Sequence, residues 1–291
     1  MKIAIHGKST GIEAQACIRE LLGIIESSGH EIAISRSYKE YLAEKSFDVN
    51  GVDTFGISDD LSSFNFLFSL GGDGTILDSI TYANSSETPI VGINLGRLGF
   101  LSTIARTDIA EVIKRLEAGD YNVESRSLLH MDSNEGLFEP HSFGLNEMTI
   151  TKKESSSMIV VHTYVDGDYL NSYWADGLIV ATPTGSTGYS LSCGGPLVHP
   201  NQKNFIITPV SPHNLNVRPM IVSDQSKITF EIEGRSKEFL VSLDSRSMPV
   251  DESVEISIQR EQFEAKLVRF ADSNYFDTLR NKLNWGLDAR N

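Results

Sequence analysis

Phe66-Leu67-Phe68-Ser69-Leu70 runs directly into Gly71-Gly72-Asp73-Gly74-Thr75, and this stretch decides how the rest of the chain is interpreted. Its apolar half predicts a buried β-strand, and the glycines after it allow a tight turn that directs backbone N–H groups outward. A helix that begins near Thr75 adds the positive end of its dipole at the same place. The stretch therefore predicts an anion-binding loop at the carboxyl end of a strand, where open α/β sheets bind ligands.

Asp73 is an unexpected residue in such a loop, because its carboxylate repels a bare polyphosphate. The repulsion disappears when the ligand arrives with a divalent cation. It also disappears when the carboxylate accepts a proton from a hydroxyl group that then attacks phosphorus. Both situations belong to phosphoryl transfer, so the loop indicates a kinase. The simpler interpretation is a strand-to-helix turn in which Asp73 only caps the helix, as Asp does well.

The first third of the chain alternates strand and helix patterns. Strands are predicted at residues 2–6, 31–35, 64–70 and 89–95, and helices at residues 12–26, 38–43, 75–83 and 108–118. Alternation of this kind produces parallel strands with helices packed on the faces of the sheet. We therefore expect residues 1–120 to form an α/β domain with an open, mostly parallel sheet, which carries the glycine loop.

From about Asn122 the pattern changes to short segments rich in Val, Ile, Thr, Tyr and Phe. Examples are residues 158–165, 178–181, 227–232 and 254–258. Such segments are typical of antiparallel sheets, so we expect an all-β, sandwich-like domain at residues 121–271. Residues 273–283 return to helical spacing. We expect this C-terminal helix to return to the first domain, so that residues 272–291 complete it.

The chain of 291 residues carries a formal net charge of −14. Binding to nucleic acid or to an anionic membrane depends on clustered Lys and Arg, which the sequence lacks, so neither partner is expected. No apolar run approaches the length of a membrane span, and the N-terminus reads as a strand rather than as a signal sequence. Cys17 and Cys193 are the only cysteines. We therefore expect a cytoplasmic protein.

A second constellation lies in the predicted β domain, between Trp174 and Pro196, and is dense in Gly, Ser and Thr. A strand that enters such a loop lets a ligand approach the backbone closely and offers it neutral donors and acceptors. Asp176 adds a carboxylate and Tyr189 adds a ring for stacking. Taken alone, the same composition also fits an ordinary turn-rich connection between two strands.

Four motifs occur in order along the chain: the glycine loop, Asn94-Leu95-Gly96-Arg97-Leu98-Gly99-Phe100, Asn146-Glu147, and the block at residues 174–196. In this combination the sequence resembles the ATP-NAD kinase family, bacterial type, over nearly the whole chain. The resemblance implies ATP with magnesium, or another divalent cation, as the donor and NAD as the acceptor. It further implies transfer of the γ-phosphoryl group to the 2′-hydroxyl of the adenosine ribose, and a homodimer or homotetramer.

The resemblance also assigns roles position by position. Asp73 resembles the family's general base, and Gly71, Gly72, Gly74 and Thr75 resemble its donor-phosphate loop. The pair Asn146-Glu147 is implied to bind the ribose and adenine of NAD, and Asp176 its nicotinamide part. The residues implied to contact NAD are Asp73, Gly74, Phe100, Asn146, Glu147, Asp176, Thr184, Thr187, Gly188, Tyr189 and Ser192. No direct set of protein ligands for a metal is implied, since magnesium arrives with ATP.

Two positions depart from the family's pattern. Gly188 stands where Ala is common, and Asp244-Ser245-Arg246 stands where many relatives have Asp-Gly-Gln. The second departure leaves open whether Arg246 reaches phosphates or simply lies at a strand end. His130, His141, His162 and His199 lack metal-ligand spacing, and we expect surface or satisfied, partly buried histidines.

Two alternative functions stay open at this point. A lipid kinase of the diacylglycerol or sphingosine type shares the glycine loop, but it should show a basic amphipathic route to the membrane, whereas this chain is strongly acidic. A non-catalytic dinucleotide sensor would be expected to have lost the carboxylate of Asp73, which is present.

Overall fold

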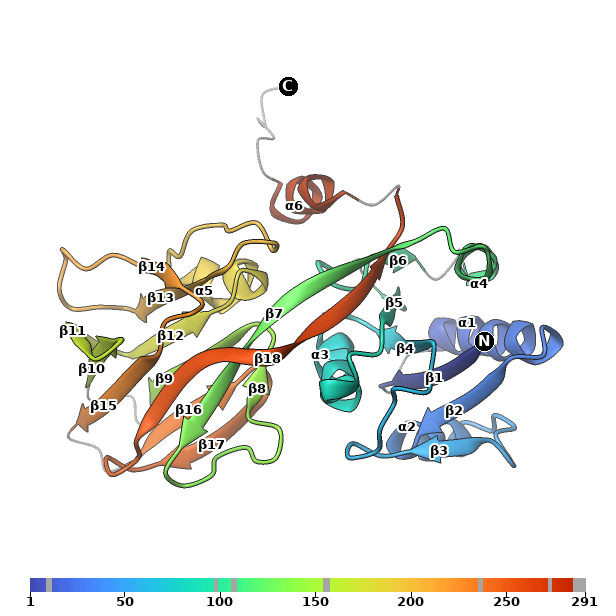
Figure 1. Cartoon of the computed structure of the whole chain (residues 1–291), viewed down its shortest axis with the longest axis horizontal. Coiled ribbons are helices and arrows are strands. Elements are labelled where there is room, and N and C mark those ends of the chain that lie inside the picture. The colour runs from blue at the N-terminus through green and yellow to red at the C-terminus, as the bar shows by residue number, and fades with distance from the viewer. Residues whose placement is uncertain are drawn as a thin grey trace. The chain divides into compact units, whose positions relative to one another are not determined.

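The computed structural model describes residues 1–8, 12–96, 99–105, 109–153, 158–234, 238–271 and 274–284. The chain divides into two units, Met1–Ser125 with Ala265–Asn291, and Arg126–Glu264 (Figure 1). The predicted boundaries, after residues 120 and 271, differ from these by a few residues. Arg97 and Leu98 of the predicted second motif lie outside the described residues, as do residues 272, 273 and 285–291 of the predicted C-terminal segment. No helix in the described part of the chain is long and apolar enough to cross a bilayer.

A parallel sheet forms the centre of the first unit. Its strands are β1 (Lys2–Gly7), β2 (Glu31–Ser35), β3 (Asp53–Phe55), β4 (Phe66–Gly71), β5 (Ile90–Asn94) and β6 (Ile104–Ala105). They follow the order β5-β4-β1-β2-β3, and β5 also pairs in parallel with β6. Through Leu267, the end of β18 (Ile256–Arg269) pairs with β5 as well. Every residue of β4 is buried, as expected for a strand covered on both faces.

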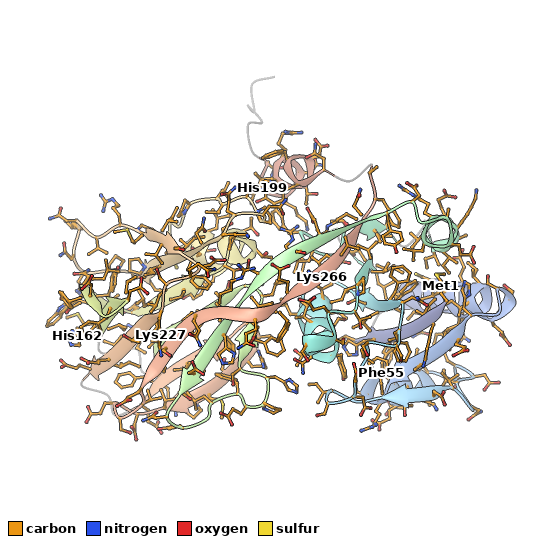
Figure 2. The ribbon with its side chains drawn as sticks, in the orientation of Figure 1. Met1, Phe55, His162, His199, Lys227 and Lys266 are labelled. Atoms are coloured by element: carbon orange, nitrogen blue, oxygen red, sulfur yellow. The ribbon has the colours of Figure 1, made fainter. Side chains whose placement is uncertain are left out.

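The helices of the first unit are α1 (Ile12–Ser27), α2 (Arg36–Glu44), α3 (Asp73–Ala83), α4 (Ile109–Ala118) and α6 (Tyr275–Leu283). Helix α4 buries Ile109, Val112, Ile113 and Leu116, the spacing of one helix face, and these residues share a core with α1 and the sheet. Helix α3 packs so closely on β5 that a Cβ on Gly92 would lie 2.6 Å from Cδ1 of Ile76. Figure 2 adds the side chains and labels Phe55 at the end of β3.

The second unit is built from antiparallel strands. Their bounds are β7 (Asn122–Ser133), β8 (Phe143–Gly144), β9 (Glu147–Lys152), β10 (Ile159–Val165), β11 (Asp168–Ala175), β12 (Gly177–Ala181), β13 (Asn204–Val210), β14 (Met220–Ser223), β15 (Ile228–Gly234), β16 (Phe239–Leu243) and β17 (Arg246–Val250). One sheet has the order β14-β13-β12-β9-β16-β17, and the other contains β11-β10-β15-β18, with β7 beside β18 and β8.

Both sheets of the second unit contribute to one core. Phe205 on β13 and Phe239 on β16 are buried in one cluster with Phe230 on β15 and Ile258 on β18. The alternation of buried and exposed residues along β15 is the pattern of a strand with one face on a core. The predicted fold class, an α/β domain with a mostly parallel sheet followed by an antiparallel β domain, is confirmed.

Two elements differ from the sequence prediction. Strand β18 runs over Ile256–Arg269, far beyond the predicted residues 254–258. Its central part is polar, so the apolar pattern that marks a strand is lost there although the strand continues. The predicted loop after β12 instead contains a 3-10 helix at Thr184–Thr187 and the short helix α5 (Tyr189–Ser192).

Candidate functional site

The glycine loop joins β4 to α3, and its glycines have different surroundings. Gly71 is buried, and a Cβ there would lie 2.1 Å from Oγ1 of Thr75, so only glycine fits. Gly72 and Gly74 are exposed, and apart from their chain neighbours and the backbone of α3 no heavy atom lies within 4 Å of the position that a Cβ would take. Thr75 is buried, and its N–H donates to the carbonyl of Gly72 at 2.9 Å. The backbone at Gly72 and Gly74 is therefore open to an anion at the start of a helix.

The carboxylate of Asp73 accepts three backbone N–H groups from one segment of chain. The N–H of Phe100 donates to Oδ2 at 2.8 Å, and those of Leu101 and Ser102 donate to Oδ1 at 3.0 Å each. Gly72, and not Asp73, is the N-cap of α3. The interpretation of Asp73 as a simple helix cap is therefore wrong, because its side chain anchors residues 100–102.

The segment after β5 is fastened to the glycine loop at further points. A Cβ on Gly99 would lie 1.8 Å from Oδ1 of Asp73, so glycine allows the close approach. The hydroxyl of Ser102 donates to the carbonyl of Gly71 at 3.2 Å, and the amide of Asn94 donates to the carbonyl of Ser102 at 3.3 Å. The first unit thus brings two of the predicted motifs together and places half-buried Phe100 on the segment that Asp73 holds.

A lysine follows β1, the strand that pairs with β4. Nζ of Lys8 lies 2.6 Å from Oδ2 of Asp78, which belongs to α3. Nε2 of buried His6 lies 4.0 Å from the same oxygen. Although burial acts to raise it, the pKa of Asp78 is held below its usual value by the neighbouring His6 ring and the Lys8 ammonium group. Lys8 therefore places a positive charge at the carboxyl edge of the sheet, where β4 ends and the glycine loop begins.

In the second unit, Asp244 accepts the backbone N–H groups of three consecutive residues. The N–H of Leu145 donates to Oδ2 at 2.8 Å, and those of Asn146 and Glu147 donate to Oδ1 at 2.8 Å and 3.1 Å. Burial raises the pKa of the Asp244 carboxyl, while these donors and Arg246 act in the opposite direction. Asp244 thus holds the predicted pair Asn146-Glu147 through the backbone N–H groups of these two residues.

Glu147 has an unusual environment for a carboxyl group. Burial, and then the charge of Asp244, raise its pKa from about 4.5 to about 7. Its Oε2 is buried and has no hydrogen-bond partner among the described residues. A Cβ on Gly188 would lie 3.1 Å from this oxygen. At neutral pH Glu147 is therefore poised between its charged and neutral forms.

The block at residues 174–196 folds against Asn146. A Cβ on Gly185 would lie 2.1 Å from the carbonyl oxygen of Asn146, and that oxygen accepts the N–H of Thr182 at 2.8 Å. Gly188 is therefore the end of a tightly packed turn that reaches the Glu147 carboxyl. The second unit brings together Asn146, Glu147 and Gly188, three of the residues predicted to contact NAD.

The remaining predicted residues of the block differ in exposure. Thr184 is buried, Thr187 and Asp176 are half-buried, and Tyr189 and Ser192 are exposed. Oδ1 of Asp176 pairs with Nζ of Lys152 at 2.6 Å. Burial, and then Cys193 and Asp176, raise the pKa of Tyr189 above its usual value. Asp176 and Tyr189 therefore lie within electrostatic reach of each other.

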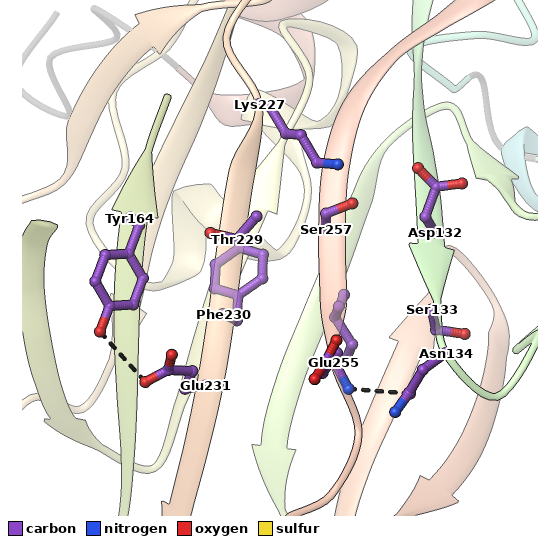
Figure 3. A pocket seen from close by; sticks show the side chains of 11 residues that line it. Asp132, Ser133, Asn134, Tyr164, Lys227, Thr229, Phe230, Glu231, Glu255 and Ser257 are labelled. Carbon is purple, nitrogen blue, oxygen red and sulfur yellow. Dashed lines mark hydrogen bonds between the residues drawn. The ribbon is translucent and has the colours of Figure 1, made fainter. Parts of the chain in front are cut away.

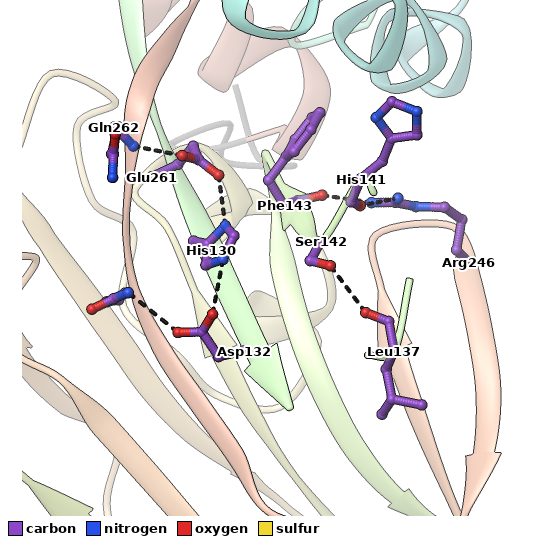
Figure 4. A network of polar contacts seen from close by, with 10 residues as sticks. His130, Asp132, Leu137, His141, Ser142, Phe143, Arg246, Glu261 and Gln262 are labelled. Carbon is purple, nitrogen blue, oxygen red and sulfur yellow. Dashed lines mark hydrogen bonds and ion pairs between the residues drawn. The ribbon is translucent and has the colours of Figure 1, made fainter. Parts of the chain in front are cut away.

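Arg246, whose role the sequence left open, has contacts within the chain. Its guanidinium donates to the carbonyls of His141 and Phe143, so it braces this segment from the first position of β17 (Figure 4). His141 is buried, and both of its ring nitrogens lack hydrogen-bond partners in the described part of the chain, unlike the satisfied histidine that was expected. Burial, and then Arg246, lower the pKa of His141, which favours the neutral ring.

His130 behaves as expected for a satisfied histidine. Nδ1 lies 2.7 Å from Oε2 of Glu261 and Nε2 lies 3.1 Å from Oδ1 of Asp132 (Figure 4). The hydrogen bond to Glu261 raises its pKa. Within the described residues, no group of three or more His, Cys, Asp or Glu is arranged to hold a metal ion.

A pocket of about 490 Å³ lies on the second unit but contains none of the predicted residues. Figure 3 shows that Lys227, Glu231 and Glu255 are among its lining side chains, and that Tyr164 donates to Glu231. It lies over β15 and β18, whereas the predicted residues lie on β9 and in the block after β12.

Sequence reasoning missed several residues that shape the site: Lys8, Asp78, Gly144, Gly185 and Asp244. Asp244 was noticed only as part of a departure from the family's pattern. Its contacts depend on residues almost a hundred positions away, which no local pattern reveals. Lys8 had a detectable signal, because Gly7-Lys8-Ser9-Thr10-Gly11 follows the first strand and precedes a helix.

Comparisons with known proteins agree with this geometry. Residues 19–121 match the family model of the ATP-NAD kinase N-terminal domain, and residues 145–270 match that of the C-terminal domain. The chain is 49% identical over 292 residues to an NAD kinase of Cytophaga hutchinsonii, with 100% of both chains covered. It is 41% identical over 295 residues to an NAD kinase of Flavobacterium johnsoniae, again with 100% of both covered.

Two solved structures share the fold. A yeast NADH kinase complexed with NADH has a TM-score of 0.84 at 21% identity, covering 99% of this chain and 88% of that one. An NAD kinase from Archaeoglobus fulgidus in complex with ATP has a TM-score of 0.71 at 28% identity, covering 98% and 99%. These matches do not favour a lipid kinase or a sensor. The chain therefore belongs to the ATP-NAD kinase family and is a kinase that phosphorylates NAD with ATP as the donor.

Proposed function

We propose that the γ-phosphoryl group of ATP is transferred to the 2′-hydroxyl of the adenosine ribose of NAD, with Asp73 as the residue that orients this hydroxyl. The 2′-oxygen forms the new bond to phosphorus, the bond between phosphorus and the bridging oxygen of ADP breaks, and the hydroxyl proton passes to the Asp73 carboxylate. The observation that carries the proposal is the carboxylate of Asp73, held by three N–H groups beside the open backbone of Gly72 and Gly74.

The geometry favours a positioning role for Asp73 over strong basicity. A carboxylate offers about four acceptor positions, and backbone N–H groups take three of them. One position is left for a hydroxyl group, in a direction fixed by the other three bonds. Since phosphoryl transfer depends above all on in-line geometry and charge neutralisation, a well-aimed acceptor is sufficient.

We assign the donor phosphates to Gly71, Gly72, Gly74 and Thr75, with Lys8 as the cation that supports them. The chain has a formal net charge of −14, so a triphosphate needs local positive charge. The start of α3 supplies part of it, the ammonium group of Lys8 adds a charge that it shares with Asp78, and a magnesium ion carried by ATP supplies the rest. ATP without a divalent cation should therefore be a poor donor.

We assign NAD to the residues that the sequence predicted. They are Asp73, Gly74, Phe100, Asn146, Glu147, Asp176, Thr184, Thr187, Gly188, Tyr189 and Ser192. The support is the packing of the 184–188 turn on Asn146 and Glu147, and the exposed ring of Tyr189, which is 40% exposed and available for stacking. Asn146 and Glu147 suit ribose hydroxyls because they offer both a donor and acceptors.

We also propose that the protein is a cytoplasmic homodimer or homotetramer. The second unit exposes several large apolar side chains, among them Trp174 at 53%, Met220 at 44% and Ile221 at 48%. Single exposed apolar residues are common, but Met220 and Ile221 lie on β14, an edge strand of its sheet, and an edge strand is a place where a strand of another chain can pair. Light scattering at several protein concentrations measures the assembly directly.

The test of the proposed reaction is NADP formation from NAD, ATP and magnesium, read with an NADP-specific dehydrogenase. Omission of magnesium and replacement of Asp73 by Asn should each remove most of the product. NAD binding, measured by calorimetry, should survive in Asp73→Asn. Loss of NAD binding in a folded Asp73→Asn protein would contradict the assigned role.

A further inference from the structure

Asp244 stands out because it is a half-buried acidic residue that the proposed reaction does not use. It follows β16 directly, at a backbone φ of 53°, and its carboxylate turns back toward the start of β9. There it accepts the N–H groups of Leu145, Asn146 and Glu147. The backbone of Asp244 also bonds to this segment, since its N–H donates to the carbonyl of Glu147 at 2.9 Å.

The neighbouring glycine makes this contact possible. A Cβ on Gly144 would lie 3.2 Å from Oδ1 of Asp244 and 3.1 Å from Cδ1 of Leu243, tighter than ordinary packing. Glycine therefore lets the backbone of residues 145–147 come within hydrogen-bond distance of the carboxylate. We call this arrangement of Gly144, Asp244 and the three N–H groups the Asp244 clamp.

We propose that Asp244 is a positioning residue for nucleotide binding: the Asp244 clamp fixes the backbone from which Asn146 and Glu147 reach NAD. The inference rests on the proposed function, in which Asn146 and Glu147 contact the ribose and adenine. It goes beyond that function, because Asp244 itself touches no substrate in the proposal.

The residues around Glu147 determine its pKa. The adjoining strands β12 and β16 carry no titratable side chain, and the turn at Thr184–Thr187 carries none. Asp244 is the charged group whose field raises the pKa of Glu147, after burial itself. Arg246 acts on Asp244, lowering its pKa, and donates to backbone carbonyls of residues 141 and 143. A neutral residue at 244 should therefore let Glu147 ionise at lower pH.

The experiment compares Asp244→Asn with Asp251→Asn. The amide introduced by Asp244→Asn would place an N–H₂ donor where a carboxylate oxygen accepts an N–H, so part of the clamp is lost. Asp251 is a matched control, since it is an exposed Asp that accepts the N–H of Ser253 in a turn. Kinetics are measured at about pH 8.5, where Glu147 is largely ionised in both proteins. There we expect Asp244→Asn to raise the KM for NAD about tenfold and to leave the KM for ATP unchanged. Asp251→Asn should change neither.

A second readout does not depend on NAD. The carboxyl of Glu147 is titrated by carbon NMR in the ligand-free protein, and amide hydrogen exchange is measured at residues 145–147. Asp244→Asn should move the titration midpoint of Glu147 to lower pH and accelerate exchange at these amides at least tenfold. Both values should stay at the wild-type level in Asp251→Asn.

The outcomes separate the clamp from the proposed function. If Asn146→Ala leaves NAD affinity unchanged, the proposed contacts to NAD are wrong, and the clamp is then judged by the NMR and exchange data alone. If the Glu147 midpoint and the KM for NAD are both unchanged in folded Asp244→Asn, the inference is overturned. Should that variant fail to fold, Gly144→Ala, which crowds the clamp by one methyl group, must raise the KM for NAD, and an unchanged KM overturns it.

Discussion

Asp73 in the first unit and Asp244 in the second use the same backbone device in different surroundings. Each carboxylate accepts three consecutive N–H groups, one on Oδ2 and two on Oδ1. In each case a glycine, Gly99 or Gly144, precedes the three donors and allows the close approach. Two unrelated folds, a parallel sheet and an antiparallel one, thus hold a functional loop by the same means.

The difference lies in what accompanies each carboxylate. Asp73 begins α3 beside exposed glycines, so its remaining acceptor position can serve a reacting hydroxyl. Asp244 lies beside a second carboxyl, Glu147, and beside Arg246. Under the proposed roles, the same hydrogen-bond pattern serves chemistry at Asp73, which lies beside open backbone, and serves geometry at Asp244, which lies beside Glu147 and Arg246.

The largest effect is expected from Asp73→Asn. Because the variant removes an acceptor that aims the nucleophile, kcat should fall by about 10²–10⁴-fold, while the KM for NAD changes little. Steady-state kinetics with NAD and ATP measure both constants. A variant that raised the KM for NAD with kcat preserved would make Asp73 resemble Asp244 and break the comparison.

The second prediction concerns the loss of stability when Gly99 or Gly144 is replaced by Ala. A Cβ on Gly99 would overlap Oδ1 of Asp73 at 1.8 Å, whereas one on Gly144 would only crowd its neighbours at 3.1–3.2 Å. We expect Gly99→Ala to reduce the free energy of unfolding by about 2–3 kcal/mol and Gly144→Ala by about 1 kcal/mol or less. Urea unfolding measures both. Equal losses would show that the two loops yield to crowding in the same way.

Lys8→Met tests whether Lys8, in the first unit, contributes to the binding of ATP and not to that of NAD. The loss of a charge-assisted contact to phosphate should raise the KM for ATP about tenfold and leave the KM for NAD unchanged. Lys8→Arg should recover part of the affinity. Lys153, an exposed lysine paired with Glu238 in the second unit, provides the control variant Lys153→Met, which should behave as wild type. An unchanged KM for ATP in Lys8→Met removes Lys8 from the donor site.

The smallest effect concerns pH and the second unit alone. Glu147 has a pKa of about 7, and ribose hydroxyls donate best to its ionised form. As pH falls from about 7.5 to about 6.5, the ionised fraction of Glu147 drops about threefold, so the Kd for NAD should rise about threefold. The Kd for ATP should not follow the ionisation of Glu147. Calorimetry across this range checks it, and Glu147→Gln should abolish the dependence. Tighter NAD binding at low pH would mean that neutral Glu147 is the binding form.

Much of the fold could be predicted from local patterns. The apolar run ending at Leu70, the helix face of α4 and the alternation along β15 all follow from the spacing of apolar residues. Strand β18 could be recognised only in part, because its central residues are polar and its pairing depends on distant strands. The short helices after β12 were hidden by Gly, Ser and Thr, which favour turns wherever they fall.

The candidate site divides in the same way. Asp73 and the glycines around it were visible because a strand, a turn and a helix are consecutive in sequence. The bonds from Asp73 to residues 100–102 and from Asp244 to residues 145–147 were not visible, since they join segments 27 and 97 or more positions apart. The pKa of Glu147 was equally hidden, because it depends on burial and on a carboxylate supplied by another strand end.

The different surroundings of the loop glycines decide which of them another residue can replace. Gly71 is held by packing, so any descendant that keeps the fold keeps this glycine. Gly74 lies in the first turn of α3 with open space beside it, where alanine would strengthen the helix by about 0.5–1 kcal/mol. A lineage released from its substrate would therefore gain stability by losing Gly74 while Gly71 stayed. Under the proposed donor-phosphate role, glycine at position 74 lowers the stability of the helix and leaves the backbone open for the phosphates.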